Sequence, residues 1–100
     1  MQTIPINSDR LLSDLRELRK IGGVSSGVVR PAFCDADMEA RYWLKRKFEG
    51  AHLDTKIDGV GNVLGRSQKL GSSILLGSHS DTQPEGGWLD GALGVIYGLE

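Results

Sequence analysis

The feature that most constrains the fold is a short apolar run, Ile74-Leu75-Leu76, with turn-forming residues on both sides. Three residues are too few for a helix, and an apolar run without alternation is typical of a β-strand that is buried on both faces. Such strands lie inside α/β sheets, so the run predicts an α/β fold with a central sheet flanked by helices. Ligands in these folds bind beyond the carboxyl ends of the strands, so we expect a functional site just after Leu76.

The rest of the chain predicts three helices and one β-hairpin. Apolar residues that recur at steps of three and four indicate the helices, and alternation of apolar and polar residues before a glycine-rich turn indicates the hairpin. The expected elements are a helix over residues 8–21 with Asn7 or Ser8 as its N-cap, a helix over 35–50, a hairpin with strands from 53 and from 63, and a helix-like pattern over 91–100. The last pattern stops at Glu100 without a cap or a polar tail, so we expect a truncated domain.

Composition argues against several classes of protein. The net charge of −1 argues against a nucleic-acid binder, and we interpret the basic cluster RYWLKRK as a solvated helix face. No run approaches the roughly 18 apolar residues of a membrane span. The single cysteine, Cys34, gives no disulfide framework, and the N-terminus lacks the layout of a signal peptide. We therefore expect a cytoplasmic protein.

Three side chains that can bind a metal or move a proton follow the apolar run: His79, Asp81 and Asp90. Residues two apart in an extended segment point to the same side, so Asp81 can accept a hydrogen bond from one nitrogen of His79 while the other binds a metal. Asp90 precedes Gly91, where a carboxylate can either bridge two metal ions or cap a helix. The residues alone leave these roles open, as they do a plain surface loop at His79 and Asp81.

Two segments, GSHSDT (77–82) and PEGGWLDGALGV (84–95), resemble the metal-binding signature of the dinuclear metallohydrolases of the peptidase-20 family. The branch they resemble most contains N-carbamoyl-L-amino acid hydrolases, allantoate amidohydrolases and β-ureidopropionases. Three further stretches agree with it: DLRELRKIGG, VVRPAFCDAD and DGVGNVLGR.

The resemblance implies that residues 1–100 are the N-terminal portion of a three-layer α/β/α zinc-peptidase-like catalytic domain, without the dimerisation (lid) domain. It also implies two divalent metal ions, which would be zinc, manganese, cobalt or nickel. His79 would ligate one metal, Asp90 would bridge both, and Asp81 would be the catalytic carboxylate that supports His79. The metals would lower the pKa of a bridging water and polarise the scissile carbonyl. The general base and the remaining ligands are expected beyond residue 100.

The implied reaction is cleavage of the carbamoyl (ureido) C–N bond of N-carbamoyl-L-amino acids or related ureides, which releases the amino acid, CO2 and ammonia. One alternative is a dipeptidase or N-acyl amino acid deacylase of the same family, and another is a non-catalytic fragment or interaction module. The expected partners are a small ureido or amide substrate and, for the full-length protein, a second subunit of a homodimer, with neither nucleic acid nor membrane. Zinc sites usually have three or four protein ligands, so we expect the 100-residue chain alone to be inactive.

Overall fold

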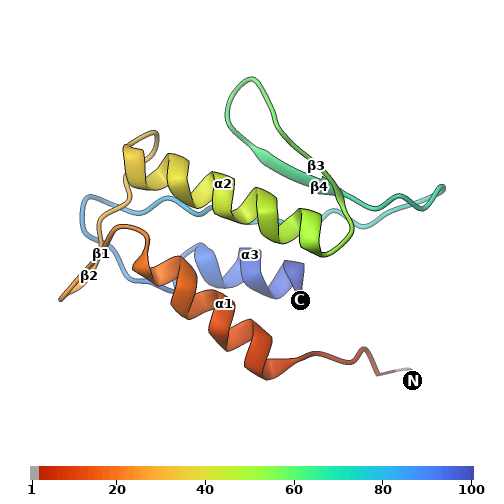
Figure 1. Ribbon diagram of the computed structural model, residues 1–100, viewed down its shortest axis with the longest axis horizontal. Coiled ribbons are helices and arrows are strands. Elements are labelled where there is room, and N and C mark those ends of the chain that lie inside the picture. Colours follow the sequence, from red (N-terminus) through yellow and green to blue (C-terminus); the bar gives the residue numbers. More distant parts are fainter. Residues whose placement is uncertain (1–2) are drawn as a thin grey trace.

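Three helices and two short β-hairpins make up the regular structure of residues 3–100, the part of the chain that the computed structural model describes (Figure 1). The strands pair antiparallel, β1 with β2 and β3 with β4. The β3–β4 hairpin packs on α2, and α1 packs on α3. The elements are α1 (Ser8–Lys20), β1 (Gly23–Val24), β2 (Gly27–Val28), α2 (Asp35–Gly50), β3 (Asp54–Ile57), β4 (Val63–Arg66) and α3 (Ala92–Leu99).

The apolar stripes of the three helices meet in one core. Leu18 of α1, Leu44 of α2 and Ile96 of α3 are each at most 3% exposed. Full burial of such a side chain contributes about 1.5–3 kcal/mol to folding, so this core is the main source of stability. Its buried members are Leu15, Leu18, Ile21, Ala40, Leu44, Ala92 and Ile96.

The helices and the hairpin expected from the sequence are confirmed to within one or two residues. Asn7 is the N-cap of α1, and its side-chain oxygen accepts a hydrogen bond from the Arg10 N–H at 3.0 Å. In the β3–β4 hairpin Ile57 pairs with Val63, and the Asp58 carboxylate closes the turn by accepting from nearby N–H groups. The β1–β2 hairpin is an element that the sequence patterns above do not predict.

The expected buried strand at Ile74-Leu75-Leu76 is wrong for this chain. These side chains are 87%, 91% and 66% exposed, and no strand is assigned between β4 and α3 in the described part of the chain. The segment runs as an open trace across the molecule behind α2 (Figure 1). A strand buried on both faces needs neighbours on both edges, and residues 3–100 supply none there. The chain is thus a small α/β unit of three helices and short two-stranded sheets.

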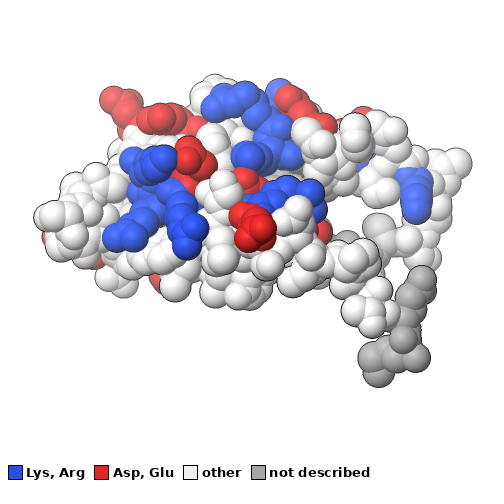
Figure 2. Space-filling model, turned by 60° about the horizontal axis from the view of Figure 1, so that its bottom comes forward, with Lys and Arg blue, Asp and Glu red and all other residues white. Residues whose placement is uncertain are grey.

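The basic cluster of α2 is not a uniform solvated face. Lys47 lies 2.7 Å from the carboxylate of Asp14, which is only 6% exposed, and Lys45 pairs with Glu49 at 2.9 Å. Figure 2 shows Lys and Arg side chains interspersed with Asp and Glu on one face. Lys45 and Lys47 are therefore paired with carboxylates and do not form a separate basic patch. No helix in residues 3–100 is both long enough and apolar enough to cross a membrane.

One buried cation ties the end of α1 to the segment that carries the candidate site. Arg30 is 1% exposed and donates from Nη1 to the carbonyl oxygens of Leu18 (2.9 Å) and Ile21 (2.7 Å). Its Nε donates to the Ser80 carbonyl at 2.8 Å, and its own carbonyl accepts from the Thr82 N–H at 2.8 Å. Burial lowers the pKa of the Arg30 guanidinium while Asp37 opposes that shift, and an arginine stays charged in either case. Arg30 therefore satisfies carbonyls at the C-terminus of α1 and fixes the position of residues 80–82.

The substitution Arg30→Met tests this role. It keeps much of the apolar stem but removes the donors, so buried carbonyls lose their partners. We expect the free energy of unfolding, measured by urea denaturation, to fall by about 3 kcal/mol. The exposed Arg16 is the matched control, and Arg16→Met should change the unfolding free energy by less than about 0.5 kcal/mol. Equal effects of the two substitutions would contradict the assignment.

Candidate functional site

The candidate site forms where the N-terminus of α3 meets the segment that contains His79. Gly91, the N-cap of α3, has a φ of 72°, which favours glycine. A Cβ at this position would lie 2.5 Å from Cε1 and 2.6 Å from Nδ1 of His79, so only glycine lets the imidazole approach. Asp90 directly precedes Gly91. The packing therefore brings the His79 ring against the N-terminus of α3, next to the backbone of Asp90.

The same close approach continues along α3. A Cβ at Gly94 would lie 2.8 Å from Cβ of Ser78, which is closer than side-chain atoms approach. At Gly98 the Cβ would lie 3.5 Å from Cβ of Leu76, an ordinary van der Waals distance. One face of α3 thus lies against residues 76–79, with the tightest contact at the end that carries the site.

His79 and Asp81 are in contact, an arrangement that their spacing allows but does not require. Nδ1 of His79 lies 3.1 Å from Oδ1 of Asp81 and 3.1 Å from the Asp81 carbonyl oxygen. Both neighbours of Nδ1 are acceptors, so we assign the proton of the neutral ring to Nδ1. Nε2 then carries the lone pair that a metal ion binds. The side chains are 54% and 38% exposed, so the ring is accessible. Their ligand and catalytic roles stay predictions.

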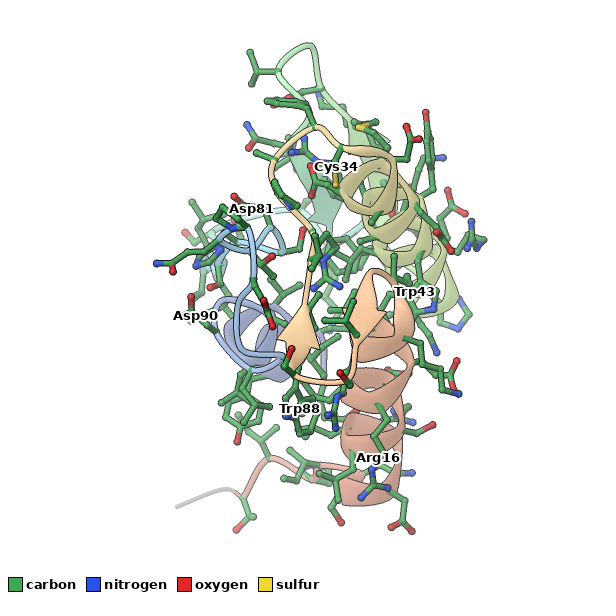
Figure 3. All side chains as sticks on the ribbon, turned by 90° about the vertical axis from the view of Figure 1, so that its left-hand side faces the viewer. Arg16, Cys34, Trp43, Asp81, Trp88 and Asp90 are labelled. Carbon is green, nitrogen blue, oxygen red and sulfur yellow. The ribbon has the colours of Figure 1, made fainter. Side chains whose placement is uncertain are left out.

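Asp90 does not cap α3. The N-cap is Gly91, and no side chain makes a capping hydrogen bond there. Within residues 3–100 the Asp90 carboxylate forms no hydrogen bond or ion pair, and the residue is exposed. Figure 3 shows Asp81 and Asp90 on the same side of the molecule. Asp90 is therefore not the helix cap that the sequence left as one alternative. Its bridging role stays a prediction.

Backbone hydrogen bonds and a packed tryptophan attach the loop between Asp81 and Asp90 to the rest of the chain. Val28 and Gly86 exchange two backbone hydrogen bonds, each 2.8 Å long. Trp88 packs against the core, and the Arg19 guanidinium carbon lies 4.9 Å from the centroid of its ring. These contacts hold the middle of the loop against β2 and α1.

A cavity of about 280 Å³ adjoins His79 and Asp81. Arg41 and the β3–β4 turn form its far wall. Arg41 donates from Nη1 to the carbonyl oxygen of Gly61 at 2.7 Å, and its Nε and Nη2 lie 3.0 Å and 2.7 Å from Oδ2 of Asp37. Asp37 is fully buried, so this ion pair fixes the turn against α2.

Arg41 is the first residue of the basic cluster RYWLKRK, and its expected place on a solvated helix face is wrong. The side chain is only 12% exposed. The spacing of Asp37 and Arg41, four residues apart on a helix, is the signal from which the pair could have been found.

The donors present fit part of a metal site. His79 offers an imidazole nitrogen and Asp90 a carboxylate, the donor types that zinc, manganese, cobalt and nickel accept. In the described part of the chain no three His, Cys, Asp or Glu side chains are grouped so that they could hold a metal ion. Two protein ligands fall short of the three or four that zinc sites use. A complete site would need further ligands.

Comparison with known proteins identifies the class as amidohydrolases. The chain is 41% identical over 99 residues to an N-carbamoyl-L-amino-acid amidohydrolase of Rhizobium meliloti. The aligned region covers 95% of this chain and 24% of that protein. It is 34% identical over 94 residues to allantoate deiminase 1 of Glycine max, and the aligned region covers 91% of this chain and 20% of that protein. No family model matches the sequence.

Comparison with solved structures points to the same kind of protein. An amidase of the hydantoinase/carbamoylase family from Burkholderia phymatum superposes on the whole chain with a TM-score of 0.97 and 55% identity, and the match covers 25% of that amidase. A second member, from Burkholderia ambifaria, gives a TM-score of 0.89 at 37% identity, with 95% of this chain and 24% of the other covered. The chain belongs to the hydantoinase/carbamoylase amidase family, and it spans about a quarter of the length of the relatives that it matches.

Two glycines of α3 provide a matched test of how the site is built. Gly94→Ala places a Cβ against Ser78, so we expect it to lower the free energy of unfolding by about 1–3 kcal/mol. Gly98→Ala meets Leu76 at an ordinary distance, and the better helix propensity of alanine should raise stability by about 0.5–1 kcal/mol. Urea denaturation measures both, and effects of the same sign would refute the packing described.

Proposed function

We propose that this chain supplies part of the active site of a metal-dependent amidohydrolase that cleaves the carbamoyl C–N bond of N-carbamoyl-L-amino acids or related ureides. Residues 1–100 would be the N-terminal portion of its catalytic domain. The observation that carries the proposal is the His79–Asp81 contact, which leaves the imidazole Nε2 available on an accessible surface. The similarity to carbamoylases and allantoate deiminases supports the choice of substrate class.

Each residue has a role that its contacts allow. Asp81 holds His79 by accepting from Nδ1–H, so that Nε2 faces outward as a donor to one metal ion. The exposed Asp90 carboxylate, which precedes the N-cap of α3, would bind the metals together with His79. Bound divalent metal would supply activation of a water and polarisation of the scissile carbonyl. In the net reaction, water and the ureido group give the free amine of the amino acid, CO2 and ammonia.

The remaining parts of the site would come from outside these 100 residues. They are a general base, further metal ligands and the groups that bind the substrate. We therefore expect the chain alone to release no ammonia from any ureide, and a longer protein that contains it to act as a homodimer with zinc, manganese, cobalt or nickel bound.

A chimeric enzyme tests the proposed function. Residues 1–100 would replace the matched quarter of the Burkholderia phymatum amidase, a substitution that the TM-score of 0.97 makes reasonable. We expect the chimera, loaded with manganese or zinc, to release ammonia from N-carbamoyl-L-amino acids or allantoate. His79→Ala and Asp90→Ala should reduce the release to background, and Asp81→Asn should lower it by about 10–100-fold. Arg16→Ala, on the exposed face of α1, is the control and should leave the activity unchanged.

The other outcomes separate the alternatives. Amine without ammonia from dipeptides or N-acetyl amino acids would keep the site and replace the substrate with a true amide. Full activity after His79→Ala would contradict the assigned role of His79. A folded, dimeric chimera that is silent on every substrate would favour a non-catalytic fragment or interaction module.

A further inference from the structure

Thr82, the residue after Asp81, is hydrogen-bonded to Arg30 in two ways. The Thr82 N–H donates to the Arg30 carbonyl oxygen at 2.8 Å, and the Arg30 N–H donates to the Thr82 hydroxyl oxygen at 2.9 Å. In an ordinary antiparallel pair the second bond would reach a backbone carbonyl, so the hydroxyl takes the place of that carbonyl. The hydroxyl oxygen also lies 2.7 Å from the carbonyl oxygen of Gln83 and 3.2 Å from that of Val28, to which its own hydrogen can be donated.

Arg30 and Thr82 hold Asp81 through the peptide groups on either side of it. The Ser80 carbonyl accepts from Nε of Arg30 at 2.8 Å, and the Thr82 N–H donates to the Arg30 carbonyl. A trans peptide is planar, and its N–H and C=O groups point in opposite directions. The bond from the Thr82 N–H therefore directs the Asp81 carbonyl away from Arg30. That carbonyl oxygen lies 3.1 Å from Nδ1 of His79, so it is one of the two acceptors that face the ring.

The two partners differ in how deeply they lie in the fold. Arg30 is 1% exposed, and its Nη1 donates to two carbonyls at the end of α1, so a change of its side chain disturbs the core as well as the site. Thr82 is half-buried, and valine has nearly the same shape without the hydroxyl. Thr82 is thus the position at which this hydrogen bond can be removed while the fold is kept.

We propose that Thr82 is a positioning residue of the candidate metal site, and that its hydroxyl sets the backbone of Asp81 so that Asp81 accepts from Nδ1 of His79. The inference rests on the proposed function, because the orientation of the ring affects activity only where Nε2 binds a metal. Acceptors at Nδ1 keep the proton there and leave the Nε2 lone pair free. Without the hydroxyl the Arg30 N–H loses its partner, and the turn at Asp81 is held by fewer bonds.

The tautomer of the neutral His79 ring tests the proposal in the chain without metal. At about pH 8.5, where an ordinary imidazole is neutral, the chemical shifts of the ring nitrogens show which of them carries the proton. We expect Nδ1–H in the native chain, a mixture of both tautomers in Thr82→Val, and Nδ1–H again in Thr82→Ser, which keeps a hydroxyl. Thr55→Val on β3 is the matched control, because it removes a hydroxyl that donates to the Leu53 carbonyl at 3.0 Å, and it should leave the tautomer unchanged.

Zinc affinity of the chimera with the Burkholderia phymatum amidase is the second measurement. We expect Thr82→Val to weaken zinc binding about 10-fold and Thr82→Ser to weaken it by less than about twofold, since partners that orient a ligand act on metal affinity. At saturating zinc the kcat of Thr82→Val should return to that of the unsubstituted chimera. A purely structural role would lower kcat at every zinc concentration and leave the affinity unchanged.

The outcomes separate this proposal from the proposed function. An unchanged tautomer or an unchanged zinc affinity in Thr82→Val would overturn the positioning role even in an active chimera. A shifted tautomer in a chain whose chimera neither binds zinc nor acts on any substrate would support the positioning role and contradict the function. Thr82→Ala removes the same hydroxyl without a methyl group against the Arg30 N–H, and it decides the test where Thr82→Val does not fold. Failure of both variants to fold would also overturn the proposal, because the hydroxyl would then serve folding.

Discussion

The close approach between α3 and residues 76–79 is the constraint on which the candidate site depends. Gly91 and Gly94 let the helix lie directly against His79 and Ser78, and side chains at either position would force the two segments apart. Close packing tolerates few such changes, because protein interiors are nearly as dense as organic crystals. The contact does more than fill space. It sets the imidazole of His79 against the N-terminus of α3, next to the backbone of Asp90, although the two residues lie on separate segments.

Polar contacts hold this arrangement from the opposite side. Arg30 bonds the end of α1 to the Ser80 carbonyl, and Arg41 bonds the β3–β4 turn to α2 at the wall of the cavity. Burying a cation costs free energy unless its N–H groups form hydrogen bonds, and both arginines donate such bonds to carbonyl oxygens. The site is therefore held by the core on one side and by buried guanidinium groups on the other, while His79 and Asp90 remain accessible.

Structural features that depend on residues close together in the sequence could be predicted from it, and features that depend on distant residues could not. The helices and the β3–β4 hairpin follow from periodicity, and a spacing of two residues makes the His79–Asp81 contact possible without requiring it. The burial of Ile74-Leu75-Leu76 could not be predicted correctly, because burial depends on neighbours that these 100 residues do not supply. The contact of Arg30 with Ser80 joins residues 50 apart in the sequence, and no local pattern encodes it.

The placement of the His79 ring is the central claim, and a nuclear Overhauser spectrum of the isotope-labelled chain tests it most directly. The account predicts a strong cross-peak between the Hε1 proton of His79 and the Hα protons of Gly91, because a Cβ at residue 91 would lie only 2.5 Å from Cε1 of His79. An imidazole that shows cross-peaks only to its sequence neighbours would contradict the account. In that case His79 and Asp90 would not be brought together by α3.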